Sequence, residues 1–139
     1  MTDLIEVKTA DLAGEALGWA VGMAEGMSLH LEPPQYGNGW RVFAIYRGEA
    51  TERFDRYNPW EAWALGGELV DQFQVALIPE AHEGPDGTEA SERWRAEVYY
   101  NAGEHYGTDY RDTALIAACQ AVVATEYGDT VQVPKELIQ

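Results

Sequence analysis

The sequence predicts an α+β fold, with one domain over residues 1–139 and a largely antiparallel sheet of about five strands flanked by two long helices and one short helix. Two observations predict this class. Two long stretches repeat apolar residues at three- and four-residue spacing, which is the period of a helix. Several shorter stretches alternate polar and apolar residues, as strands with one covered face do. A chain of 139 residues also has the length of a single domain.

The clearest predicted helix lies near the C-terminus, between Asp112 and Gly128. Its apolar residues fall on one face: Leu115, Ile116, Cys119, Val122, Val123 and Tyr127. Asp109 or Asp112 can cap its first turn, and Gly128 can end it by adopting a left-handed conformation. Residues 130–133 then alternate polar and apolar side chains. We therefore expect a helix laid across the sheet, followed by a strand that joins the sheet.

A second long helix is expected over residues 10–26, after a short strand at residues 4–8. Thr9 or Asp11 can cap this helix, and Gly26 can end it. Its buried face is marked by apolar residues at helical spacing: Leu12, Ala16, Trp19, Ala20, Met23 and Met27.

Three glycines, Gly14, Gly18 and Gly22, recur at four-residue intervals within that helix. Each one costs about 1 kcal/mol relative to alanine in a helix interior. Glycines at this spacing can form a groove that lets another segment approach the helix closely. Alternatively, they lie on an exposed face of the helix, where glycine is tolerated. We expect the exposed face.

Further strands are expected at residues 28–32, 40–46, 73–78 and 94–100. Residues 40–46 carry apolar side chains on both faces, so we expect this strand to be central. Residues 94–100 alternate, which predicts a strand with one face in water.

Two polar stretches are expected to be loops. Residues 79–91 contain the sequence Gly-Pro-Asp-Gly, and we expect this segment to be the most mobile part of the chain. Residues 101–109 contain glycine and lead into the C-terminal helix.

Basic residues gather between residues 41 and 56, where four of the nine lie: Arg41, Arg47, Arg53 and Arg56. Glu49, Glu52 and Asp55 interleave with them. We therefore expect local ion pairs on a solvated loop and not a basic patch.

The net charge of −15 excludes several classes of partner. Such a surface repels nucleic-acid phosphates and anionic lipid, so we expect neither direct nucleic-acid binding nor membrane binding. No apolar run approaches the ~20 residues of a membrane span, and the N-terminal residues lack the pattern of a signal peptide. We expect a cytoplasmic protein. The acids are spread along the chain, which favours a solvated surface; the alternative is an acidic face that mimics DNA.

No local motif for catalysis, metal binding or cofactor binding is present. The lone Cys119 lies on the predicted apolar helix face, where a buried thiol is expected. His30, His82 and His105 lack the spacing of a zinc motif, and phosphate-binding loops and nucleophile elbows are absent. We expect no catalytic residue, metal ligand or cofactor. An enzyme with a dispersed site, centred on His105 and its neighbours, is the alternative.

The most unusual stretch is residues 57–75, in which two tryptophans, a tyrosine and a glycine pair lie close together. The candidate binding residues are Tyr57, Trp60, Trp63, Gly66 and Gly67. Trp60 and Trp63 are spaced to lie side by side on one helical turn, which Gly66 and Gly67 then interrupt before a short helix resumes over residues 68–72. Two interpretations are open for Trp60 and Trp63. If the indoles are exposed, they form a recognition surface; if they are buried, they cover the edge of the core.

Three stretches together resemble one family: TADLAGEALGWAVGMAEG, YNPWEAWALGGELVDQF and DTALIAACQAVVATEYGDTVQVPKEL. Their order and spacing are similar to those of small phage and prophage proteins of the NinX-like family. The resemblance covers nearly the whole chain and is most recognisable over residues 63–67 and 128–134. It implies a phage-derived accessory protein and supplies no catalytic residues.

The expected function is therefore non-enzymatic binding of a host or phage protein, through an apolar patch near Trp60 and Trp63. The first alternative is an acidic DNA mimic that blocks a nucleic-acid-binding protein. The second is an enzyme with a dispersed site.

Overall fold

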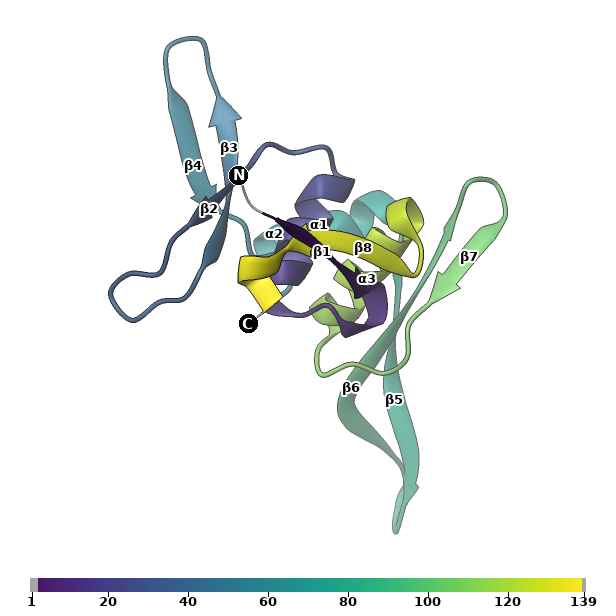
Figure 1. Ribbon diagram of the computed structural model, residues 1–139. Coiled ribbons are helices and arrows are strands. Elements are labelled where there is room, and N and C mark those ends of the chain that lie inside the picture. Colours follow the sequence, from purple (N-terminus) through teal and green to yellow (C-terminus); the bar gives the residue numbers. More distant parts are fainter. Residues whose placement is uncertain (1–2, 139) are drawn as a thin grey trace.

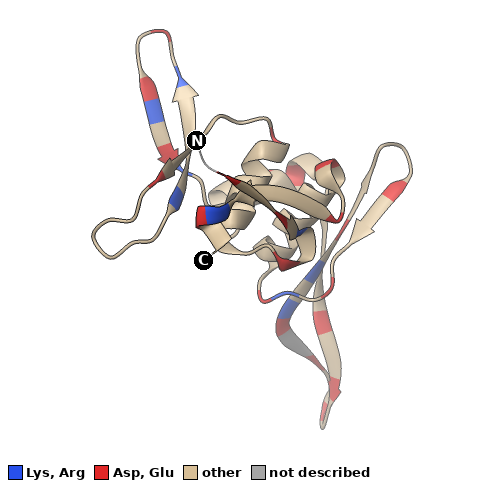
Figure 2. Ribbon diagram, in the orientation of Figure 1, with Lys and Arg blue, Asp and Glu red and all other residues tan. Residues whose placement is uncertain are grey.

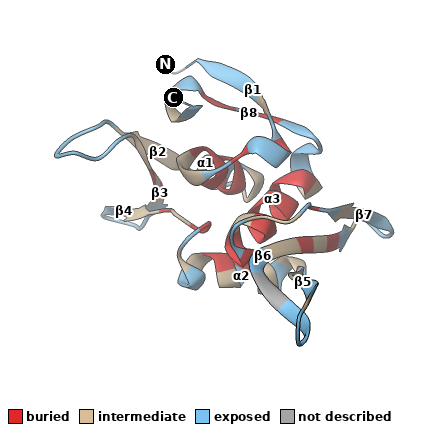
Figure 3. Ribbon diagram, turned by 90° about the horizontal axis from the view of Figure 1, so that it is seen from below, coloured by how far each residue is buried: buried red, intermediate tan, exposed pale blue. Residues whose placement is uncertain are grey.

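The computed structural model describes residues 3–138, apart from the side chains of residues 90 and 91. Three helices occupy the centre: α1 (Gly14–Ala24), α2 (Trp63–Phe73) and α3 (Ala114–Tyr127). The buried apolar side chains of all three belong to one core cluster. Figure 3 shows that the buried residues concentrate on α1 and α3. Among the described residues, no helix is long and apolar enough to cross a membrane.

Helix α3 is the centre of the core. Every residue from 114 to 124 is buried except Ile116, and Tyr127 is partly exposed. The predicted core face is therefore confirmed at Leu115, Cys119, Val122 and Val123, and neighbours cover α3 on other sides as well. Its alanines allow this close packing: Ala114, Ala117, Ala118, Ala121 and Ala124.

The strands form three antiparallel sheets. The first pairs β1 (Leu4–Lys8) with β8 (Thr130–Pro134), the second has the order β2-β3-β4, and the third has the order β5-β6-β7. The remaining bounds are β2 Leu29–Glu32, β3 Arg41–Arg47, β4 Glu52–Arg56, β5 Ala76–Gly84, β6 Gly87–Tyr100 and β7 Glu104–Gly107.

The predicted α+β class, with antiparallel strands and three helices, is confirmed. The strands, however, are divided among three sheets instead of one sheet of about five. Helices α1 and α3 pack on each other, with the first two sheets against α1 and the third against α3. The sheets thus cover different sides of the helices, as Figure 1 shows, and cannot join.

The first and last strands of the chain pair with each other. β1 pairs with β8 from Leu4 opposite Pro134 to Lys8 opposite Thr130. Both strands were predicted, and β3 is central in its sheet, also as predicted. The strand expected at residues 94–100 lies within β6, with Val98 buried and Tyr99 71% exposed.

Both predicted loops contain strands. β5 and β6 run through residues 79–91 as a long hairpin that projects from the body (Figure 1), and β7 lies within residues 101–109. Residues 80–83 are mostly exposed, so this hairpin lacks the alternation that marks a covered strand. The Gly-Pro-Asp-Gly sequence forms only its turn. The strand expected at residues 73–78 starts instead at Ala76, because α2 extends to Phe73.

The helix caps differ from those predicted. Helix α3 is capped by Thr113, whose Oγ1 accepts from the N–H of Ile116 at 3.1 Å, and not by Asp109 or Asp112. Helix α1 begins at Gly14, not at residue 10. Thr9 lies in the short 3-10 helix η1 (Thr9–Asp11), fully buried, and its hydroxyl donates to the carbonyl of Gly128 at 2.7 Å. Gly128 ends α3 as predicted, with φ 75°.

Two of the three glycines of α1 are buried, so the expectation of an exposed face is wrong. A Cβ at Gly22 would lie 2.8 Å from Cδ1 of Leu29, and Gly18 packs against the indole of Trp60. These glycines let β2 and Trp60 approach the helix closely.

The predicted ion pairs among the arginines are confirmed. Arg47 pairs with Glu52 and Arg53 with Asp55, each at 2.8 Å. Arg56 pairs with Glu15 on α1. Arg41 and Arg47 lie in β3, and Arg53 and Arg56 lie in β4, so the segment is a pair of antiparallel strands and not a loop.

Candidate functional site

Trp60 and Trp63 have different environments. A turn separates them, since the carbonyl of Asn58 accepts from the N–H groups of Glu61 and Ala62 at 3.1 and 3.0 Å. Helix α2 begins only at Trp63, so the prediction that both indoles share one helical turn is wrong. Trp60 is 9% exposed, whereas Trp63 is 60% exposed.

Trp60 belongs to the core. Its ring packs on Gly18, and the guanidinium carbon of Arg56 lies 5.6 Å from the ring centroid. The sequence allowed two alternatives, indoles that cover the core and indoles on an exposed surface. Trp60 follows the first and Trp63 the second.

Gly66 and Gly67 lie within α2 and do not interrupt it, contrary to the prediction. Gly66 is buried where α2 meets α3: an added Cβ would overlap the carbonyl oxygen of Pro59 and lie 2.6 Å from Cδ2 of Leu115. The nearest atom to a Cβ at Gly67 is in the Trp63 ring, at 3.8 Å. Only Gly66 is needed for close packing.

A cavity of about 360 Å³ separates the start of α2 from the start of α3. We call it the Trp63 cavity. It is lined by Trp60, Glu61 and Trp63 on one side and by residues 113–116 on the other. The apolar spacing of α3 places Leu115 and Ile116 on a core face and does not show their part in this site, because no local pattern shows that the first turn of α3 lies beside residue 63.

Tyr57, the remaining predicted site residue, is 5% exposed and lies away from the Trp63 cavity. Its N–H donates to the carbonyl of Val42 at 3.0 Å. Burial, and after it the nearby Cys119, raises the pKa of its hydroxyl well above the usual range. Tyr57 instead lines a second cavity, of about 250 Å³, which we call the Tyr57 cavity.

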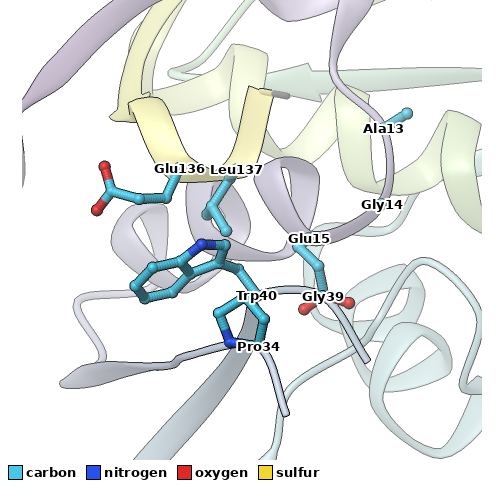
Figure 4. A pocket seen from close by; sticks show the side chains of 8 residues that line it. All are labelled: Ala13, Gly14, Glu15, Pro34, Gly39, Trp40, Glu136 and Leu137. Carbon is cyan, nitrogen blue, oxygen red and sulfur yellow. The ribbon is translucent and has the colours of Figure 1, made fainter. Parts of the chain in front are cut away.

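A third hollow, of about 480 Å³, lies between the start of α1 and the 3-10 helix η2 (Lys135–Ile138). Figure 4 shows the Trp40 indole between Pro34 and the segment that carries Glu136 and Leu137. The Glu15 carboxylate at this hollow is already engaged, because it accepts from the N–H of Val42 and pairs with Arg56.

A further apolar groove, of about 400 Å³, lies between α1 and the β1-β8 sheet. Three of its apolar side chains are well exposed: Leu4, Met23 and Tyr127. Figure 2 shows acidic residues on strands of all three sheets, so they do not gather on one element.

The histidines do not form a joint site. His30 pairs with Glu32 at 2.9 Å, His82 lies 3.8 Å from Glu89, and His105 packs on Tyr99. Within residues 3–138, no three His, Cys, Asp or Glu side chains are grouped to hold a metal ion. Among the described residues, His105, Glu104 and Tyr110 line none of the four cavities above.

Cys119 is fully buried, as predicted from its place on the apolar helix. Burial raises the pKa of its thiol from the ordinary 9.0 to about 12, so the thiol is protonated at neutral pH.

Comparison with known proteins identifies a family. No curated protein matches the chain. The sequence model of a family described as "Bacteriophage P22, NinX" matches residues 8–126, which include α1, α2 and nearly all of α3. The predicted resemblance is therefore confirmed, and the chain belongs to the phage P22 NinX family.

Proposed function

We propose that this chain is a non-enzymatic, phage-derived accessory protein that binds a host or phage protein through the Trp63 cavity. The observation that carries the proposal is an indole 60% exposed to water beside an apolar hollow of about 360 Å³. Exposed tryptophans next to preformed pockets are typical anchors of protein interfaces.

The floor of the cavity is apolar. Ala114 and Leu115 are buried beneath it, and Ile116 is partly exposed. An apolar side chain of the partner would fill the hollow and cover one face of the Trp63 indole. Both surfaces would then leave water, at about 25 cal/mol per Å² of apolar area.

The two walls of the cavity are held in place by internal contacts. Gly66 fixes α2 against Leu115, and the hydroxyl of Thr113 caps the first turn of α3. A preformed site loses little conformational entropy on binding, which favours affinity.

The carboxylate and the hydroxyl that line the Trp63 cavity are already hydrogen-bonded within the protein. The carboxylate is that of Glu61, which accepts from Nδ2 of Asn58 at 3.0 Å, and the hydroxyl of Thr113 accepts from Ile116. A partner with basic residues around its apolar anchor would complement the net charge of −15.

Affinity capture from lysates of infected and uninfected host cells tests the proposal. We expect Trp63→Ala to lower recovery of the partner by about tenfold or more, the loss of an interface anchor. Tyr99→Ala, which removes a side chain 71% exposed on β6, is the matched control and should leave recovery unchanged. Thermal denaturation of both variants checks that they fold. Equal recovery of every captured protein by the three chains would refute the proposal.

The net charge of −15 favours a second candidate, an acidic DNA mimic that occupies the groove of a nucleic-acid-binding protein. Such a mimic would compete with DNA for its partner, and competition would weaken steeply as salt is raised. Binding through the Trp63 cavity requires the indole and does not require that the partner bind DNA. Competition with DNA for the captured partner, together with the effect of Trp63→Ala on its recovery, therefore separates the two candidates.

A further inference from the structure

The Tyr57 cavity lies on the side of α2 opposite to Trp63. Leu65, Glu68, Leu69 and Gln72 line it and recur at three- and four-residue spacing, so they share one helix face. Trp63 and Gly66 lie on the other face, toward α3. A ligand in the Tyr57 cavity would therefore bind independently of a partner at Trp63.

Two carboxylates border the Tyr57 cavity without a cation. Glu25, after the end of α1, accepts from Nε2 of Gln72 at 3.1 Å. Neither Glu25 nor Glu68 forms an ion pair with any residue in the described part of the chain. The lining contains no lysine or arginine.

Tyr46, also in the lining, already contacts a cation. The guanidinium carbon of Arg53 lies 4.9 Å from the centroid of its ring, as in a cation–π contact. Arg53 is itself neutralised by Asp55 at 2.8 Å. The positive charge of Arg53 is therefore used by Asp55 and does not neutralise Glu25 or Glu68.

Tyr57 supplies the second, independent observation. Tyr57 is 5% exposed, and its hydroxyl makes no hydrogen bond to any described residue. The hydroxyl oxygen is not one of the fully buried side-chain atoms that lack a partner, so it keeps contact with water in the cavity. Three of the groups that face it, Glu25, Tyr46 and Glu68, also line the cavity. A ligand group that replaces this water can complete the hydrogen bonding of the hydroxyl.

We propose that the Tyr57 cavity binds a protonated amine or guanidinium, carried by a basic protein side chain or by a small free amine. The N–H groups of the ligand donate to the carboxylates of Glu25 and Glu68 and to the oxygen of the Tyr57 hydroxyl. Its aliphatic part lies against Met27, Leu65 and Leu69.

The size and chemistry of the cavity fit this class of ligand. A volume of about 250 Å³ holds roughly eight groups the size of a water molecule, enough for the side chain of lysine or arginine. A bare divalent metal ion fits less well, because Ca²⁺ and Mg²⁺ need six or more oxygen ligands and the lining offers apolar side chains on one side.

The test is an NMR titration of the full chain at about 150 mM salt, which screens long-range attraction to the acidic surface. The probes are n-butylammonium chloride and the peptide acetyl-Ala-Lys-Ala-amide. Butan-1-ol and the same peptide with norleucine in place of lysine are the neutral controls. The signals followed are the Gln72 side-chain amide and the Met27 methyl group.

We expect both cations, and neither neutral control, to shift these signals with saturation. Glu68→Gln should weaken binding by about tenfold, the worth of one charge-assisted hydrogen bond. Tyr57→Phe should weaken it about threefold or more while keeping the buried ring. Asp71→Asn, which removes an exposed carboxylate of α2 outside the cavity, should change affinity by less than about twofold.

The two probes also distinguish the source of the cation. Binding of the lysine peptide at least about tenfold more tightly than butylammonium supports a basic protein side chain, and equal or weaker binding supports a small amine. The proposal is overturned if the neutral probes shift the same signals equally, if neither cation saturates below about 50 mM, or if Glu68→Gln leaves both affinities unchanged. Because Glu68 is exposed, this last result does not depend on whether Tyr57→Phe folds.

Discussion

The indole of Trp60 packs onto Gly18 so closely that a Cβ at residue 18 would overlap the ring at Cζ3. The same Cβ would also lie 3.1 Å from the carbonyl oxygen of Tyr57. Gly18 therefore lets the segment that carries Tyr57 and Trp60 lie against α1, and it holds one wall of each candidate site in place.

Gly18→Ala should destabilise the protein by about 1–3 kcal/mol, because a methyl group has to displace a ring and a backbone carbonyl. Urea denaturation at neutral pH measures this free energy of unfolding. Gly39→Ala is the control, since a Cβ at Gly39 meets no atom within 4 Å and should change stability by about 0.5 kcal/mol or less. Equal stabilities of the two variants would show that the close packing is not required.

Gly66→Ala and Gly67→Ala should have opposite effects, although the residues are adjacent. Gly66 faces Pro59 and Leu115 without room for a Cβ, so its replacement should destabilise by about 1–3 kcal/mol. Gly67 has room, so alanine there should stabilise the helix by about 0.5–1 kcal/mol. Thermal denaturation of the two variants measures the difference, and a shift of both melting temperatures in one direction would contradict it.

Local pattern predicted most elements but not their assembly. The spacing of apolar residues and Gly128 located α3, alternation located β1 and β8, and a run of residues with apolar side chains on both faces located β3. The division into three sheets depends on how α1 and α3 pack, which no local pattern encodes. Only the outer part of the β5-β6 hairpin, within residues 79–91, was missed, because exposed strand residues resemble a polar loop in sequence.

The pair between Arg56 and Glu15 should be strongly coupled. Their side chains are 29% and 22% exposed, and Nη1 of Arg56 also donates to the carbonyl of Val42 at 3.0 Å. A double-mutant cycle with Arg56→Met and Glu15→Gln should give a coupling energy of about 1–3 kcal/mol.

The pair between Arg47 and Glu52 is the matched control for that cycle. Both side chains are more than half exposed, at 59% and 53%, so solvent screens their attraction. Its coupling energy should be about 0.2–1 kcal/mol. A coupling for Arg56 and Glu15 as small as that of the control would mean that the partly buried pair contributes no more than a surface pair.

Stability should fall as pH rises above 9, partly because of Cys119. Burial raises the pKa of its thiol in the folded protein from 9.0 to about 12. Below pH 9 the thiol is protonated in both states, so the full stability is present. Between about pH 9 and 12 the unfolded state releases the proton and the folded state does not. This difference lowers the free energy of unfolding by up to about 1.4 kcal/mol per pH unit.

Urea denaturation at about pH 8, 9.5 and 10.5 measures that slope. Cys119→Ala should reduce the slope while leaving the contribution of Tyr57, whose pKa is raised by burial and whose effect begins above pH 10. Identical slopes for the two proteins would show that Cys119 is not the group responsible.

Sequence reasoning identified the segment of the candidate site but not the role of each residue. Tyr57, Trp60, Trp63, Gly66 and Gly67 were grouped by composition, yet only Trp60 and Trp63 line the Trp63 cavity. The turn at Asn58 decides which indole is exposed, because it places Trp60 against Gly18 and starts α2 at Trp63. The opposite wall comes from α3, about fifty residues away, and only tertiary packing brings it near.

Site-specific photo-crosslinking in infected cells tests the central claim, protein binding through the Trp63 cavity, most directly. A photoreactive amino acid would replace Glu61 in one variant and Tyr99 in another, since both side chains are exposed but only Glu61 borders the cavity, and Trp63 is kept. We expect a discrete crosslinked protein from position 61 and none from position 99. No crosslink at position 61, or the same products from both positions, would contradict the claim.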